Sequence, residues 1–140
     1  MTDLNALIER LSRATGPDGN LDIDIYKASG QARAPDSSVM EFMLDHDGDA
    51  LWRVKHEGQD FGSWWHVPQF SSSIDAAISL GGVCVFASDI GADGLPLVKI
   101  VTDTTTTPII EYTGIAATLE LAWCIAALSA LNEADHQQNI

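Results

Sequence analysis

Trp64, Trp65 and His66 form the group of residues with the clearest potential for binding chemistry. Adjacent side chains on an extended chain point to opposite faces, so one indole can pack in the core while the other stays exposed. An exposed tryptophan is a frequent anchor in protein interfaces and stacks well on a ligand ring. Arg53 and Lys55 are the basic pair in the middle of the chain. These five residues are candidates for ligand or partner binding, with burial of both indoles as the alternative.

A run of serines at 71–73 precedes a short helix that is predicted from the apolar spacing in residues 74–80. Free N–H groups and hydroxyls at a helix start can bind an anion, which makes Ser71 and Ser72 further binding candidates. Ser72 and Asp75 also have the spacing of a capping box in its acidic form. Capping alone is therefore the alternative interpretation of these serines.

Alternating aspartates, Asp45, Asp47 and Asp49, superficially resemble a calcium-binding loop. Such a loop has glycine at its sixth position and glutamate at its twelfth, where this chain has Ala50 and His56. The pattern therefore predicts a solvated turn rather than a metal site. These acids are also partners with which Arg53 and Lys55 could simply form ion pairs.

The histidines His46, His56 and His66 are spaced ten residues apart. That spacing places no two imidazoles on one helix or strand face, so no metal ligand set is predicted. A small metal-dependent hydrolase that uses these histidines with Asp45 or Asp47 is kept as a third hypothesis, which requires folding to gather them.

The two cysteines, Cys84 and Cys124, show no CxxC pattern and are interpreted as reduced core thiols. The sequence has no GxSxG turn, no Walker A loop and no dinucleotide fingerprint. We therefore predict no cofactor and favour a binding role over catalysis. Reduced thiols and the absence of a recognisable signal peptide indicate a cytoplasmic protein.

Twenty acidic and seven basic residues give the 140-residue chain a formal net charge of −13. This charge argues against direct binding to nucleic acid and leaves a partner with a basic surface open, although acidity also serves solubility. The length predicts one domain, residues 1–140. Nothing in the composition decides the oligomeric state, so a homo-oligomer stays open.

The longest predicted element is a helix over residues 116–132, with apolar groups on nearly all faces. Thr118 is its predicted N-cap and Asn132 its end, so residues 133–140 are expected to fray. Between Glu120 and Asn132 the helix has about eleven residues, against the ~20 that a bilayer needs, so we expect a core helix and no membrane span.

Apolar periodicity and turn residues predict the remaining elements of an α/β domain. The segment 20–28 is ambiguous, because alternation slightly favours a strand while a helix capped by Asp18 or Asn20 also fits. Trp52 and Val54 are expected on the packed face of their strand. The other predicted elements are a helix over 3–15 ended by Gly16, strands over 39–44, 51–57, 83–88, 95–102 and 109–113, and a 93–94 hairpin turn.

Three segments resemble a known family. Residues 67–80 resemble the pattern VPxYTxSxDAAxxL, residues 114–131 resemble AATPxLALCxAALxA, and residues 7–28 are similar to an opening with a helix, a GPD turn and a second short helix. These patterns belong to the phage ABA sandwich domain family of small phage and prophage proteins. The resemblance implies a three-layer α-β-α sandwich with a mainly antiparallel central sheet, and it favours a helix at 20–28. It implies no known activity or site.

The preferred hypothesis is a non-enzymatic phage or prophage accessory protein that binds a host protein with a basic surface, for example to inhibit host defence. The alternative is a small-ligand or nucleotide-binding module that uses Trp64, Trp65, His66 and the serines at 71–73. The metal-dependent hydrolase is the third.

Overall fold

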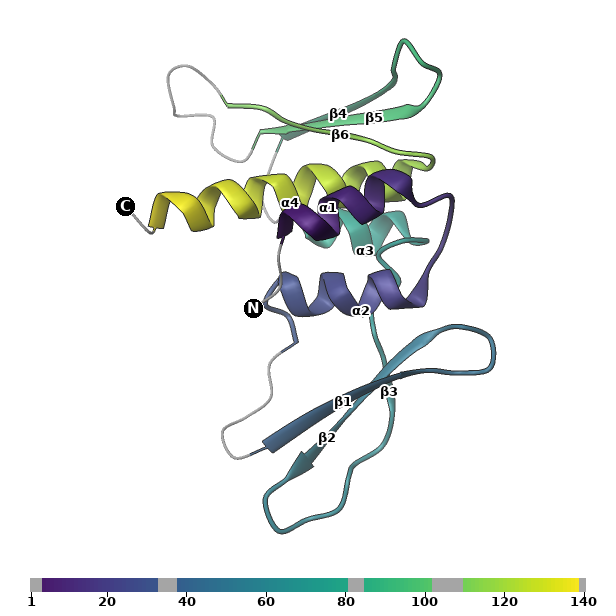
Figure 1. Ribbon diagram of the computed structural model, residues 1–140, viewed down its shortest axis with the longest axis vertical. Coiled ribbons are helices and arrows are strands. Elements are labelled where there is room, and N and C mark those ends of the chain that lie inside the picture. The colour runs from purple at the N-terminus through teal and green to yellow at the C-terminus, as the bar shows by residue number, and fades with distance from the viewer. Residues whose placement is uncertain (1–3, 33–37, 81–84, 102–109, 139–140) are drawn as a thin grey trace.

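The computed structural model describes residues 4–32, 38–80, 85–101 and 110–138, which contain helices and two three-stranded antiparallel sheets (Figure 1). The helices are α1 (Leu4–Arg13), α2 (Gly19–Ala28), α3 (Ile74–Ser79) and α4 (Leu119–Gln138). Sheet A contains β1 (Ser38–Leu44), β2 (Ala50–His56) and β3 (Trp65–His66). Sheet B contains β4 (Val85–Ile90), β5 (Pro96–Val101) and β6 (Tyr112–Ile115).

Helix α4 lies at the centre of the main core. All residues from 121 to 128 are buried, so this part of the helix has no face toward solvent. Strands β5 and β6 contact it on one side, and helices α1 and α3 contact it elsewhere (Figure 1). The predicted cap is confirmed, because the Thr118 hydroxyl accepts a hydrogen bond from the Leu121 N–H at 3.2 Å.

The predicted end of this helix at Asn132 was wrong, because α4 continues to Gln138. The loss of apolar periodicity after Asn132 marks where the helix leaves the core and not where it stops. No glycine or proline interrupts residues 133–138, so the backbone bonds can continue. The Asn132 side chain also donates a hydrogen bond to Oδ1 of Asn5 in α1, at 2.9 Å.

Helix α2 occupies the segment 20–28, which was left open because alternation slightly favoured a strand and the family resemblance favoured a helix; the helical alternative is confirmed. Its start follows the alternative interpretation, because Oδ1 of Asp18 accepts hydrogen bonds from the N–H groups of Asn20 and Leu21. Leu21 and Ile25 enter the main core, whereas Ile23 enters a second, smaller core. The alternation arises because the helix is buried on two sides.

The smaller core attaches sheet A to α2. Ala50 and Val67 are buried in it with Ile23, and Phe42 and Trp52 pack at its edge. Gly19 brings the start of α2 against the β1–β2 turn. A Cβ atom there would lie 2.3 Å from the carbonyl oxygen of Gly48, so any larger residue would separate the two elements.

The strands predicted at 39–44, 51–57, 83–88 and 95–102 are confirmed, with small changes of their ends. β1 pairs with β2, and β4 pairs with β5 through a turn in which Gly94 has a φ of 82°. The third strand of sheet B covers 112–115 rather than 109–113, because Gly114 must face α4. Cys84, the tetrathreonine at 104–107 and Pro108 lie outside the described residues.

The expected single central sheet is not confirmed. In the described ranges the helices lie between sheet B and sheet A, whereas the sandwich that the resemblance implied has a sheet between helices (Figure 1). The class of mixed α and β protein with antiparallel sheets is confirmed. Within these ranges, no helix combines the length and the apolar character that crossing a bilayer requires.

Two local predictions need correction. Gly16 does not have the left-handed backbone that was expected at the end of the first helix, which stops at Arg13. The N-cap of α3 is Ser73 rather than Ser72, because the Ser73 hydroxyl accepts the Ala76 N–H at 3.3 Å. The serine run offers three equivalent caps in sequence, and only the backbone geometry selects between them.

We expect Gly114→Ala to reduce the free energy of unfolding by about 1–3 kcal/mol, because overpacking a dense core costs that much. The added Cβ would lie 2.0 Å from the Ala122 carbonyl oxygen and 2.8 Å from the Ala126 nitrogen, and both are backbone atoms that cannot rotate away. Gly16→Ala is the matched control, since a Cβ there meets no atom within 4 Å. Equal urea midpoints for the two variants would contradict the packing of β6 on α4.

Candidate functional site

The two faces of sheet A separate the residues that were predicted to act together. Trp52 pairs with Trp65 in the antiparallel register and Leu51 pairs with His66. Paired residues share a face, so Trp65 lies on the face that packs toward α2, while His66 lies on the outer face. The Trp64 ring also lies on the outer face, over Arg53. The structure therefore places Trp65 apart from Trp64 and His66.

Trp65 borders a cavity of about 390 Å³ on the inner face of sheet A, beyond the contact with α2. Its ring is stacked on that of Trp52, with centroids 6.3 Å apart and planes 24° from parallel. The Trp65 side chain is 61% exposed, although it is a large apolar group. The cavity is lined by Trp52, Val54, His56, Gln59, Asp60, Gly62, Ser63 and Trp65.

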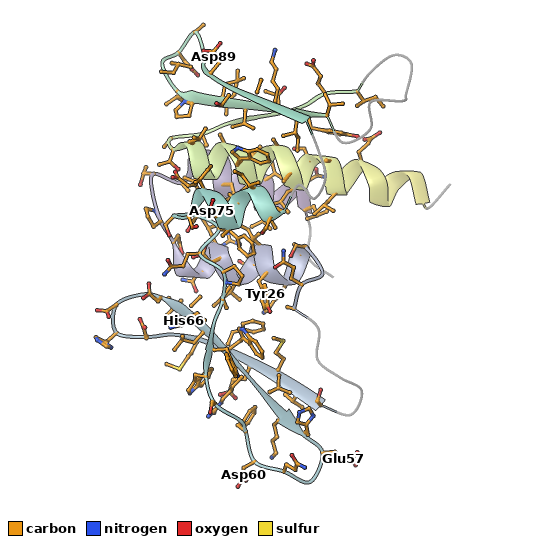
Figure 2. All side chains as sticks on the ribbon, turned by 180° about the vertical axis from the view of Figure 1, so that it is seen from behind. Tyr26, Glu57, Asp60, His66, Asp75 and Asp89 are labelled. Carbon is orange, nitrogen blue, oxygen red and sulfur yellow. The ribbon has the colours of Figure 1, made fainter. Side chains whose placement is uncertain are left out.

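The polar part of this lining comes from the loop that follows β2. Gln59, Asp60 and Ser63 are exposed and border the cavity. Figure 2 shows Asp60 in this loop, at the end of sheet A that lies away from the helices. His66 lies elsewhere, because its partner Leu51 is near the β1–β2 turn. The arrangement is an aromatic floor with a polar and acidic rim, which suits a ligand with a flat or cationic group.

Arg53, a predicted binding residue, is already bound within the chain. Its guanidinium lies 4.2 Å from the Phe61 ring centroid and 4.3 Å from that of Trp64. It donates through Nε and Nη2 to Oε1 of Glu41, at 2.9 and 2.5 Å. Lys55 is more loosely placed, with Nζ 5.8 Å from the Phe61 centroid. Arg53 therefore holds the outer face together, and its partner is Glu41 rather than the aspartates of the turn.

Ser71 has a structural position rather than the predicted role in binding an anion. It is buried, its N–H donates to Oδ1 of Asp22 at 2.8 Å, and its hydroxyl accepts the Asp18 N–H at 2.9 Å. Ser72 borders a second cavity of about 310 Å³, whose lining includes the carboxylates of Asp18, Asp22, Asp47 and Asp49. Such a surface repels anions, so it disfavours an anion site at the start of α3.

Burial raises the pKa of Asp22 above its usual value of 3.8. The hydrogen bonds from Ser71 act in the opposite direction but do not cancel the loss of solvation, and the Asp18 and Asp49 carboxylates raise the pKa further. The Asp22 carboxyl group accepts a hydrogen bond from the segment before α3 and so connects it to α2. Its raised pKa makes the stability of this connection depend on pH.

We expect Asp22→Asn to remove a pH-dependent loss of stability. The folded protein holds the Asp22 proton above pH 3.8, where the unfolded chain has lost it, so the free energy of unfolding falls through this group as pH rises. An amide oxygen can still accept the Ser71 N–H. Urea melts at pH 4 and pH 7 should show the variant gaining stability relative to the wild type at the higher pH. A difference that is the same at both pH values would contradict this assignment.

The aspartates of the β1–β2 turn form the one group of metal-ligating side chains that meets within the described residues. Asp45, Asp47 and Asp49 place ligand atoms within 4.8 Å of one another. However, Oδ1 of Asp45 accepts the N–H groups of Asp47 and Asp49, both at 2.9 Å, so the cluster is explained as turn structure. His46 and His56 lie at opposite ends of the β1–β2 hairpin, and His56 and His66 lie on opposite faces of sheet A.

Cys124 is not suited to nucleophilic chemistry. Burial raises the pKa of its thiol to about 12, and Sγ donates to the Phe70 carbonyl oxygen at 3.4 Å. A thiol in this state is a packing group, as the core position predicted.

Sequence reasoning missed most of the cavity. Strand alternation assigned Trp52 to a packed face, but it did not predict that the Trp52 ring stacks on the ring of the exposed Trp65. Gln59, Asp60 and Ser63 carry no periodic signal, because they lie in a loop. That Asp60 and Trp65 border the same cavity can be inferred only when the pairing register of β3 with β2 is known.

The described fold and cavity define a mixed α and β protein with an exposed aromatic surface and an acidic rim. No protein-family model, curated protein or solved structure matches the chain.

Proposed function

We propose that this chain is a non-enzymatic accessory protein of a phage or prophage, which binds a host protein with a basic surface through the cavity beside Trp65. One observation carries the binding role: Trp65 is 61% exposed and stacked on Trp52, in a cavity whose lining includes Asp60. The net charge of −13 supports a basic partner, because complementary charge steers association.

The phage origin is supported by the residue patterns at 7–28, 67–80 and 114–131. The three-layer α-β-α order that goes with those patterns differs from the order of the described layers, so this part of the proposal rests on the patterns alone. Action in the cytoplasm of the host cell, by inhibiting a host protein or a defence system, follows from the same proposal.

Binding is favoured over catalysis by the arrangement of the cavity's polar groups. His56, Asp60 and Ser63 all border the cavity, and these are residue types that hydrolases use. A nucleophile needs a hydrogen-bonded base, and in the described structure no hydrogen bond joins these three side chains. In contrast, the two rings that a ligand would contact, Trp52 and Trp65, are already stacked on each other.

A second candidate function is the binding of a small planar ligand. The cavity volume of about 390 Å³ falls within the range of roughly 300–1,000 Å³ that small-molecule sites occupy. A nucleobase could stack on Trp65. The residues first assigned to this function are dispersed, however, since Trp64 and His66 lie on the outer face and Ser71 is buried.

We expect Trp65→Ala to weaken partner binding by more than about 2 kcal/mol with little change in thermal stability, because its ring is exposed. Trp64→Ala is the matched control. It removes a ring that packs on Arg53, so it should lower the melting temperature and retain more of the binding. Pull-down from a phage host lysate at 50 and 500 mM salt, with purified partner titrated afterwards, measures binding, and thermal melts of the two variants measure stability.

Salt should weaken the complex by screening the charges, since the Debye length falls from about 10 Å at 0.1 M salt to roughly half of that at 500 mM. A partner that binds Trp65→Ala as tightly as the wild type would contradict the proposed surface. A thermal-shift screen of nucleosides and nucleotides tests the second candidate. A rise in melting temperature that Trp65→Ala abolishes would favour the small ligand, whereas a flat screen would remove it.

A further inference from the structure

We infer that the cavity beside Trp65 accepts an arginine side chain of the partner, with the guanidinium against the indole and within reach of the Asp60 carboxylate. This inference rests on the proposed function and names the chemical group that is recognised. It follows from a comparison of the two faces of strand β2.

The outer face of β2 shows how this sheet holds a guanidinium. Arg53 contacts two rings, those of Phe61 and Trp64, and forms its ion pair with the carboxylate of Glu41. All three interactions come from neighbouring parts of sheet A and the loop that follows β2. The protein therefore uses two aromatic rings and one carboxylate to hold one arginine.

The cavity on the inner face has the same types of group, whereas the cation of this face, Lys27, lies over the Phe42 ring at 4.8 Å and is not among the residues that line the cavity. Trp52 and Trp65 supply two rings and Asp60 supplies a carboxylate, and among the described residues no lysine or arginine lines the cavity. Gln59 and Ser63 add side-chain oxygens that can accept further N–H donors. Compared with the outer face, the described lining lacks a cationic group, which the arginine of a partner would supply.

The chemistry of the lining selects a guanidinium over other charged groups. A guanidinium is planar and weakly hydrated, so it stacks on an indole while its edge donates to a carboxylate. An ammonium is compact and strongly hydrated, and it loses more solvation in the same place. Anions are disfavoured by Asp60 and by the net charge of −13.

Titration with short peptides tests this inference directly. The probe is an acetylated and amidated pentapeptide with one arginine between glycines, followed by NMR of the tryptophan indole N–H groups. Peptides with lysine, citrulline or glutamate at the same position are the comparators. We expect the arginine peptide to shift the Trp65 resonance and to bind at least about fivefold more tightly than the lysine and citrulline peptides.

Variants of the full chain locate the contact. Trp65→Ala and Asp60→Asn should each weaken binding of the arginine peptide at least about fivefold. Asp75→Asn removes the same charge from an exposed position in the first turn of α3, far from sheet A (Figure 2), and should leave binding unchanged. Circular dichroism of each variant confirms that it is folded.

The outcomes separate this inference from the proposed function. Equal binding of the lysine and arginine peptides would overturn the choice of guanidinium and leave a basic partner standing. Equal binding of the citrulline peptide, or equal losses in Asp60→Asn and Asp75→Asn, would overturn recognition of the cation at this cavity. Absence of any peptide binding would overturn the arginine inference, while pull-down with Trp65→Ala reports on the proposed function independently.

Discussion

The rest of the structure depends on the burial of α4 on every side. Residues 121–128 have no solvent face, so the hydrophobic effect requires cover around the whole helix. Sheet B supplies that cover on one side, where Gly114 lets β6 approach the backbone at Ala122, and α1 and α3 supply it elsewhere. The alanines of α4 allow these close approaches, so the helix sets the order of the layers in the main core.

Sheet A is attached to this core through the smaller hydrophobic core around Ile23. Helix α2 uses Ile25 for the main core and Ile23 for the smaller one, and so joins the two. The contact covers the part of the inner face around Phe42 and Trp52, but β2 continues beyond it to Val54 and His56. The uncovered part of that face becomes the cavity, and the exposure of Trp65 follows from where the cover ends.

Local patterns predicted what depends on local interactions. The cap at Thr118, the β1–β2 and β4–β5 strands and the parity of Trp64 and Trp65 follow from backbone geometry that neighbouring residues determine. At 20–28 alternation slightly favoured a strand over helix α2, because burial on two sides makes Leu21, Ile23 and Ile25 alternate as in a strand. The division into two sheets and the side on which Trp65 lies depend on long-range pairing, which no periodicity contains.

Charge and shape have separate roles at the proposed binding surface. The net charge of −13 acts over the Debye length and attracts any basic partner, so it raises the rate of encounter without choosing between cations. Selection needs contact, and the stacked pair of Trp52 and Trp65 provides it at short range. An exposed indole is unfavourable in the free protein, because water gains freedom when such a surface is covered. Partner binding would remove that exposure, so the feature that is hardest to explain in the isolated chain is the one that a complex would stabilise.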